Sequence, residues 1–240
     1  MTVLLAFDTA SERMTIALSD GRRRWSRQAA GGAKASAALV PALLDLLGEA
    51  GLVLRDVDAI AFGRGPGAFT GLRTACSVAQ GLALGAAKPV LPIDNLLAVA
   101  EDARAGASPC RAWALVDARM DQIYAAEYAF AAGRWTTLVA PMLTDPAQLG
   151  ARWRDAPPQV VAGDALPAFG ARLETGAAHR VPDARVNGEA LLTLAESAWH
   201  DGAALDPARA LPLYVRDKVA STTRERDEAR AQASAGMAAP

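Results

Sequence analysis

Short apolar runs alternate with turn residues and longer apolar stretches along the first half of the chain. Three of the runs predict strands at 3–7, 14–18 and 23–28, and the Asp20-Gly21 pair between the last two is typical of a hairpin turn. The longer stretches have the length of helices. After the three strands, the pattern therefore predicts a helix over 36–49, a strand over 57–62, a helix over 72–87, a strand over 89–93 and a helix over 95–104.

The second half repeats this pattern in a weaker form after the small, glycine-containing segment 105–109. We expect strands over 111–116, 123–130, 135–139 and 160–162, a short helix from 145 and a longer one over 188–199. From residue 214 the charges alternate, which favours an exposed helix to about 231. The tail 234–240 has nothing to bury and is expected to be disordered.

Three strands followed by helix, strand, helix, strand and helix is the order of a ribonuclease-H-like unit. By this analogy we predict an α/β fold of the actin-like ATPase (ASKHA) class, with two tandem βββαβα-type domains. The predicted boundaries are 1–105 for the first domain, 106–215 for a degenerate second domain and 216–240 for the C-terminal helix and tail.

Composition adds limits to this picture. With 240 residues and 52% hydrophobic residues, the chain has ample material for a core, and its formal net charge of -1 gives no global attraction to nucleic acid. The two cysteines, Cys76 and Cys110, do not form a secreted disulfide framework. No segment approaches the roughly 20 apolar residues of a membrane span, and the N-terminal apolar run is too short for a signal peptide. We therefore expect a cytoplasmic protein without a membrane partner.

The segment from Gly63 to Arg73 is a glycine-rich turn between a predicted strand and a predicted helix. Glycines permit sharp turns, and the helix would point free N–H groups at the loop, as in many anion sites. The regular dinucleotide and Walker A patterns fail here. The candidate contacts of a vestigial nucleotide or phosphate site are Asp8, Thr9, Ser11, Gly65 and Gly67. The competing interpretation, in which Asp8 caps its own hairpin, is equally favoured.

Residues for catalysis are missing where known enzyme classes need them. A ribonuclease-H-type nuclease needs a carboxylate at the end of the fourth strand, which ends instead in Phe62-Gly63. The only histidines, His179 and His200, lack the spacing of a metal-ligand pair, and neither H-E-x-x-H nor G-x-S-x-G occurs. We assign no catalytic and no metal residue. A charged cluster between two strands is either a salt-bridged loop or a domain-positioning or partner-facing element: Asp117, Arg119 and Asp121.

Two predicted helices are almost free of charge. Between Thr74 and Ala87 no residue is charged, and from Ala35 to Gly48 the only charge is Asp45. A helix that is apolar nearly all round needs burial on two sides, and a row of small residues would let another helix approach closely. We therefore predict a helix-to-helix interface with a second protein; the alternative is an alanine-rich composition without a function. The predicted interface residues are Leu39, Leu43, Leu47, Leu72, Ala75, Cys76, Ala79 and Ala83.

Several segments resemble one protein family. The string GPGAFTGLR closely resembles the G-P-G-S-F-T-G-L-R signature of the TsaB (YeaZ) family, with Ala68 in place of the usual serine. The segments LLAFDTASERMTIAL, DARMDQIYAAEY and PLYVRDKVA are similar to other parts of that family, so the likeness runs over nearly the whole chain. The signature residues are Gly65, Pro66, Gly67, Phe69, Thr70, Gly71 and Arg73.

The resemblance implies a function that the residues alone do not give. TsaB is the non-catalytic partner in the machinery that makes N6-threonylcarbamoyladenosine (t6A) at position 37 of tRNAs reading codons that begin with adenine. The chain would then be a scaffold or activator of a TsaD-type catalytic subunit, in a complex with a TsaE-type ATPase, and would meet tRNA indirectly. A homodimer would use the same helices when TsaD is absent. ATP, ADP and metal would belong to the partner subunits, with no cofactor bound stably by this chain.

Where TsaD holds a metal with a histidine pair on its first helix, this chain reads SAALVP from residue 36, so it resembles a glycoprotease-like relative that lacks the metal ligands. Two other functions stay open. One is an active ATPase or small-molecule kinase of the same fold, and the other is a homodimeric binding module unrelated to tRNA.

Overall fold

A computed structural model describes residues 1–32, 35–104, 106 and 108–216 of the chain. The helices and strands follow in the order β1 Leu4–Asp8, β2 Arg13–Ser19, β3 Arg24–Ala30, α1 Ala35–Glu49, β4 Ala59–Gly65, α2 Phe69–Ala86, β5 Val90–Asp94, α3 Asn95–Ala103, β6 Cys110–Arg119, β7 Gln122–Ala131, β8 Arg134–Thr144, α4 Pro146–Asp155, β9 Val160–Ala162, α5 Ala165–Phe169, β10 His179–Val181 and α6 Gly188–His200. Short 3-10 turns lie at Leu54–Asp56, Gly170–Arg172 and Pro207–Arg209.

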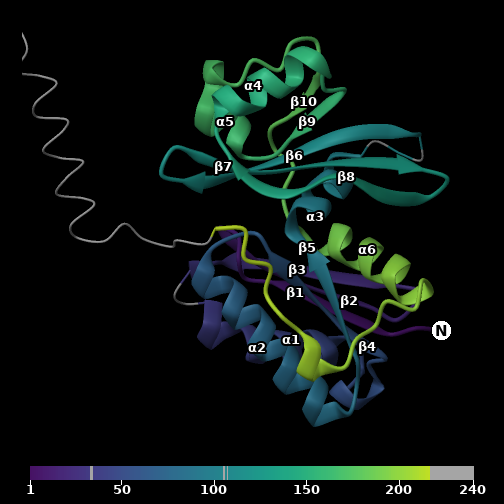
Figure 1. The fold of residues 1–240 in the computed structure, drawn as a ribbon. Coiled ribbons are helices and arrows are strands. Elements are labelled where there is room, and N and C mark those ends of the chain that lie inside the picture. Colours follow the sequence, from purple (N-terminus) through teal and green to yellow (C-terminus); the bar gives the residue numbers. More distant parts are fainter. Residues whose placement is uncertain (33–34, 105, 107, 217–240) are drawn as a thin grey trace, which may run out of the picture.

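Two five-stranded sheets with the same strand order form the framework (Figure 1). The first is ordered β3-β2-β1-β4-β5 and the second β8-β7-β6-β9-β10. In each sheet the first three strands pair antiparallel and the later two join in parallel. The prediction of an α/β fold built from two tandem domains is therefore confirmed.

Helices cover both faces of the first sheet. Alternate residues of β1 point to opposite faces, as in any strand. Leu5 and Phe7 pack in one apolar cluster with α1 and α2, whereas Leu4 and Ala6 pack in another with α3 and α6. Because β1 is buried on both faces, its sequence is a continuous apolar run instead of an alternating one.

The helix α6 lies in the sequence range that we expected for the second domain, but it packs on the first sheet. Arg24 of β3 holds it there through ion pairs of 2.9 Å to Glu189 and 2.6 Å to Glu196. The face of the first sheet that carries Leu4 and Ala6 needs this cover. The predicted 106–215 unit therefore differs from the structure, in which the chain returns to the first domain after β10.

Residues 201–216, which we call the C-terminal strap, run from α6 along α2 to the mouth between the two lobes (Figure 1). The strap pairs with β5 through two backbone hydrogen bonds between Leu205 and Val90, of 2.8 and 2.9 Å. The helix expected from residue 214 does not begin there, because 211–216 have no regular secondary structure. The remainder of that expected helix and the tail 234–240 lie outside the described residues.

The helix α3 lies between the two sheets (Figure 1). It belongs to an apolar cluster that includes Leu4 and Ala6 of the first sheet and Ala114, Ala126 and Tyr128 of the second. One continuous core therefore joins the two lobes. No helix within the described ranges combines the length and the apolar character that crossing a membrane requires.

Candidate functional site

The glycine turn begins where β4 ends at Gly65, and α2 starts at Phe69, three residues earlier than predicted. Gly65 has φ +119°, and a side chain there would meet the backbone oxygen of Leu213 at 2.8 Å. At Gly71, a Cβ would lie 2.1 Å from the backbone oxygen of Thr9. The glycines thus let the first turn of α2 approach the β1–β2 link and the strap at backbone contact.

Asp8 at the end of β1 is fully buried and already has its hydrogen-bond donors. Its Oδ2 accepts from the Ala10 amide at 3.1 Å and from the Ser11 amide and hydroxyl at 3.2 and 2.8 Å. Its Oδ1 accepts from Nδ2 of Asn95 at 3.0 Å. Burial raises the pKa of Asp8, while these hydrogen bonds oppose the shift. The geometry favours the interpretation of Asp8 as a hairpin cap.

Asn95, which the sequence pattern did not single out, completes this network. Its Oδ1 accepts from the Gly65 amide at 3.0 Å while its Nδ2 donates to Asp8. The amide side chain therefore joins the ends of β1 and β4 to the start of α3. An apolar-periodicity search cannot find such a residue, because the signal is a single buried polar side chain.

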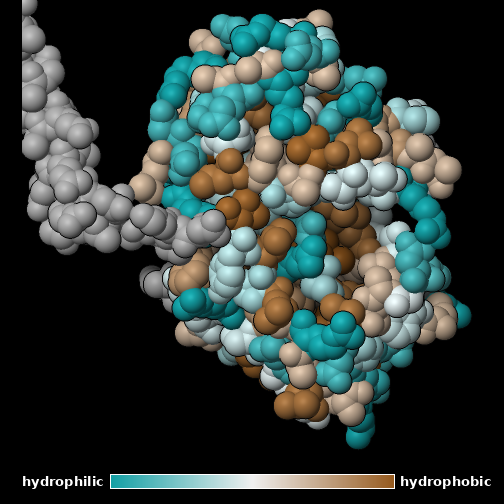
Figure 2. Space-filling model, viewed as in Figure 1, coloured by the Kyte–Doolittle hydropathy of each residue, from teal (hydrophilic) through white to brown (hydrophobic). Residues whose placement is uncertain are grey.

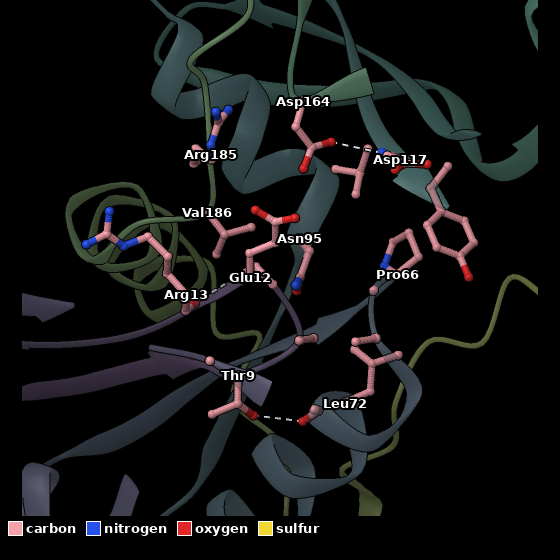
Figure 3. Close-up of a pocket in the computed structure, with 18 of the residues that line it drawn as sticks. Thr9, Glu12, Arg13, Pro66, Leu72, Asn95, Asp117, Asp164, Arg185 and Val186 are labelled. Carbon is pink, nitrogen blue, oxygen red and sulfur yellow. Dashed lines mark hydrogen bonds between the residues drawn. The ribbon is translucent and has the colours of Figure 1, made fainter. Parts of the chain in front are cut away.

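A cleft of about 1400 Å³ opens between the two domains (Figure 3). In Figure 3, Thr9, Glu12 and Arg13 of the first domain lie opposite Asp117 and Asp164 of the second. Of the predicted contact residues, Thr9, Ser11 and Gly67 line the cleft, whereas Asp8 and Gly65 lie beneath its wall. The hydroxyl of Thr9 donates to the backbone oxygen of Gly71 at 2.8 Å.

The cleft is lined by charged side chains of both signs in nearly equal number. Its carboxylates are Glu12, Asp102, Asp117, Asp164 and Asp183, and its cations are Arg13, Arg119, Arg185 and Arg216. The carboxylate of Asp164 accepts from the Asp117 amide at 2.8 Å, and burial raises the pKa of Asp164. Five carboxylates and four guanidinium groups nearly balance, so the charges of the cleft give an anionic ligand no general attraction. Among the described residues, the lining shows no cluster of cations that would by itself indicate a phosphate site.

The charged residues after β6 form two separate sets of ion pairs. Arg119 pairs with Asp117 at 2.9 Å and reaches Glu12 of the first domain at 3.0 Å, so it crosses the cleft. Asp121 pairs instead with Arg172, at 2.5 Å. Arg119, Met120 and Asp121 all have left-handed φ values, of 60°, 55° and 61°. Such a turn of non-glycine residues is uncommon, and the ion pairs hold it in place.

The predicted interface residues lie on the wrong side of their helices. All of them are buried in the first domain's own core, at 0–5% exposure: Leu39, Leu43, Leu47, Leu72, Ala75, Cys76, Ala79 and Ala83. The prediction of these residues is therefore wrong, because their side chains are buried within the chain itself and are not accessible to a partner. The outward stripes, at helical spacing, are Ala37, Pro41, Leu44 and Gly48 on α1, and Arg73, Ser77, Gly81 and Leu84 on α2.

These outward stripes are weakly polar. Leu44 is 50% exposed and Leu84 is 76% exposed. The hydroxyls of Ser36 and Thr74, which lie 3.1 Å apart, join the first turn of α1 to the second turn of α2. The two helices therefore present one common surface, which we call the α1/α2 face.

The C-terminal strap contacts the glycine signature, although the two segments are far apart in the sequence. Phe69 of the glycine signature and Tyr214 of the strap have ring centroids 5.3 Å apart, and Nε of Arg73 donates to the Tyr214 hydroxyl at 3.1 Å. Among the other signature residues, Pro66 follows a cis peptide bond and Thr70 is exposed in the first turn of α2. Sequence reasoning missed Tyr214, since no local pattern links it to residues 69–73.

Metal-ligating side chains do not gather in the part of the chain that the structure describes. Both His179 and His200 are exposed. Cys76 is buried, with its thiol donating to the backbone oxygen of Ala210 in the strap at 3.4 Å, and Cys110 is half-buried.

Comparisons with known proteins agree with the signature. Residues 32–174 match the family described as TsaD: tRNA N6-adenosine threonylcarbamoyltransferase. The "tRNA threonylcarbamoyladenosine biosynthesis protein TsaB" of Haemophilus influenzae is 40% identical over 121 residues, which are 50% of this chain and 51% of that protein. The TsaB of Escherichia coli is 39% identical over 126 residues, 52% of this chain and 54% of that protein. The chain thus spans about half the length of the curated relatives it matches.

Solved structures match over a larger share. "YeaZ from Pseudomonas aeruginosa" has a TM-score of 0.81 and 36% identity, over 89% of this chain and 100% of the other. A second structure from that organism, described as an uncharacterized protein with similarity to peptidase YeaZ, has a TM-score of 0.82 and 35% identity, over 90% and 100%. The predicted actin-like fold is therefore confirmed. Signature, family match and structural likeness together show that this chain belongs to the TsaB (YeaZ) family.

Proposed function

We propose that this chain is a non-catalytic subunit that supports t6A synthesis at position 37 of tRNA, as a scaffold and activator of a TsaD-type catalytic subunit. Family membership and the names of the relatives support the role in t6A synthesis. The engagement of Asp8 in its own hairpin supports a non-catalytic part, because both of its oxygens already accept hydrogen bonds. Activation would come from contacts that favour the competent state of the partner.

The main support for this proposal is the presence of exposed glycines on the α1/α2 face. Gly48, Gly81 and Gly85 are exposed, and a Cβ at any of them would meet nothing within 4 Å. Glycine inside a helix costs about 1 kcal/mol relative to alanine, so the isolated chain has no reason of its own to keep them. Glycines allow a second helix to pack closely, which gives such a reason. Apolar residues also come to the surface of this lobe in Figure 2.

The same face accommodates the proposed partners in turn. A TsaD-type subunit would bind the α1/α2 face, and a homodimer would use that face when TsaD is absent. A TsaE-type ATPase would join the complex, and tRNA would be contacted through the catalytic subunit, consistent with the net charge of -1. ATP, ADP and metal would bind to the partner subunits, and the complex would work in the cytoplasm.

A charge placed on the α1/α2 face tests the proposal. We expect Leu84→Asp to abolish complex formation with a TsaD-type subunit in analytical ultracentrifugation, and to lower t6A formation by the complex. The matched control is Leu138→Asp on β8 of the second domain, where Leu138 is 45% exposed. That variant should bind as wild type. The scaffold model is wrong if the purified chain transfers threonylcarbamoyl by itself, or if Leu84→Asp leaves complex formation intact.

The main rival is an ATPase or small-molecule kinase of the same fold. It needs a phosphate site between the domains, and the mixed charges of the cleft do not favour one. Micromolar nucleotide affinity with turnover by the isolated chain would establish the rival. A binding module unrelated to tRNA would instead be indicated if depletion of the protein from cells left the t6A content of tRNA unchanged.

A further inference from the structure

Arg73 is the only charged residue in α2. It is exposed at the start of the second turn of the helix and belongs to the same outward stripe as Ser77, Gly81 and Leu84. A partner that packs along this stripe meets Arg73 at one end of an otherwise uncharged surface. The guanidinium therefore dominates the electrostatics of this helix surface.

The side chain of Arg73 is held in place before any partner arrives. Its Cζ lies 3.8 Å from the ring centroid of Phe69, and its Nε donates to the hydroxyl of Tyr214 at 3.1 Å. The strap is anchored beside it, because the Leu213 amide donates to the Arg64 carbonyl at 2.7 Å. Stacking and one hydrogen bond fix the plane of the guanidinium, which lowers the entropy lost on binding.

The fold itself gains little from a cation at this position. The helix dipole favours cations near the C-terminal end of a helix, whereas Arg73 lies near the N-terminal end of α2. Within the described ranges, no carboxylate lies within ion-pair distance of Arg73. Its contact with Phe69 and Tyr214 uses Nε and the face of the group, whereas the two Nη atoms have no hydrogen-bond acceptor among the described residues. Those atoms point to a ligand outside the chain.

We propose that Arg73 is the electrostatic anchor of the α1/α2 face and that a carboxylate of the TsaD-type subunit binds its guanidinium. Tyr214 is a positioning residue that acts through Arg73, so the strap is part of the partner surface. A planar guanidinium binds a carboxylate through two parallel hydrogen bonds, which also fixes the direction of the partner helix. This inference rests on the proposed function and names the chemistry of its interface.

Calorimetric titration of the full chain with the TsaD-type subunit tests the anchor. We expect Arg73→Gln to weaken binding about 10- to 100-fold, because a charge-assisted pair at an interface is lost. The affinity of the wild type should fall with added salt more steeply than that of Arg73→Gln. The matched control is Arg134→Gln, since Arg134 is 70% exposed and pairs with Asp201 away from the α1/α2 face. This control should bind as wild type.

A double-mutant cycle separates positioning from a direct contact. Tyr214→Phe alone should weaken binding several-fold, but it should have no further effect in the Arg73→Gln background. An additive effect would overturn the positioning role of Tyr214. Thermal melting of each variant checks that the fold is intact.

Two results would overturn the anchor. One is that Arg73→Gln binds the TsaD-type subunit with the affinity and salt dependence of the wild type. The proposed function would survive that result. The proposed function fails if the wild type does not bind a TsaD-type subunit at all. The other concerns phosphate: titration of the isolated chain with inorganic phosphate, followed by the NMR signal of the Arg73 Nε–H, should give no saturable shift. A saturable shift of that signal, together with phosphate binding in calorimetry that Arg73→Gln abolishes, would assign the anchor to a phosphate ligand instead of a carboxylate.

Discussion

Replacement of Gly81 by alanine should change the stability of the chain and its binding in opposite directions. Gly81 lies on the outward side of α2, and no atom lies within 4 Å of the position that a Cβ would occupy. Alanine is favoured over glycine in a helix by about 1 kcal/mol, so the free energy of unfolding should rise by up to that amount. For a chain of this size, the melting temperature should increase by about 2–4 °C.

The complex with a TsaD-type subunit should respond in the opposite sense. If a partner helix packs against Gly81, the added methyl group enters a closely packed contact, and overpacking of this kind costs about 1–3 kcal/mol. Since each 1.4 kcal/mol changes an equilibrium constant tenfold, the dissociation constant should rise about 5- to 150-fold. The two opposite signs cannot both arise from a loss of folding.

The assay is a pair of measurements on each variant, thermal melting and calorimetric titration with the TsaD-type subunit. Gly150→Ala is the matched control, because Gly150 lies in α4 of the second domain and also has nothing within 4 Å of its Cβ position. It should raise the melting temperature and leave binding unchanged. If Gly81→Ala binds as tightly as wild type, the argument from unexplained glycines is refuted.

Three further variants test the interior of the first domain and the joint between the lobes. Gly71→Ala should lower stability by about 1–3 kcal/mol in urea unfolding, because the new Cβ would lie 2.1 Å from the Thr9 carbonyl oxygen. Asp8→Asn should cost about 1–3 kcal/mol, since an amide turns an NH2 group, which only donates, toward donors from which a carboxyl oxygen now accepts. Burial raises the pKa of Asp8 above 3.8, so the contribution of Asp8 to the free energy of unfolding is largest below pH 3.8 and falls as the pH rises. The loss of unfolding free energy in Asp8→Asn should therefore shrink from acid to neutral pH. Urea unfolding at several pH values measures this loss. Tyr128→Phe should keep or raise the melting temperature, because the buried hydroxyl has no partner in the structure; a fall of several degrees would reveal a bound water.

The order of strands and helices made the fold predictable. Each apolar run of the first half is a real element, and its sheet repeats in the second half with the same strand order. Helix starts were less accurate: α2 begins at Phe69, where the preceding Ala68 offers no side-chain cap to signal it. The cover of the first sheet by α6 was not predictable, since the helical period is the same whichever sheet a helix covers.

Some residues of the candidate site were also predictable from the sequence, and others were not. The glycine signature was readable because its residues are consecutive in the sequence, although Gly65 and Gly71 serve backbone contacts to the distant residues Leu213 and Thr9. Asn95 was not readable, since its hydrogen bonds to Asp8 and Gly65 join three separate elements. Tyr214 likewise contacts Arg73 across 141 positions of sequence. Long-range polar contacts leave no periodic trace in the sequence.

The sequence pattern predicted the partner interface on the wrong side of α2, because the helix has two uncharged rows of residues at similar spacing. Ala75, Ala79 and Ala83 form one row and face the sheet, whereas Ser77, Gly81 and Leu84 form another and face solvent. Hydropathy alone cannot assign these rows, because alanine fits both environments. Glycine differs, since a helix interior disfavours it everywhere unless a close neighbour requires it. Gly81 lacks such a neighbour within its own chain, as Gly150 of α4 also does, but Gly81 shares the α1/α2 face with the exposed Gly48 and Gly85, so this group, more than the buried alanines, indicates where a partner should bind.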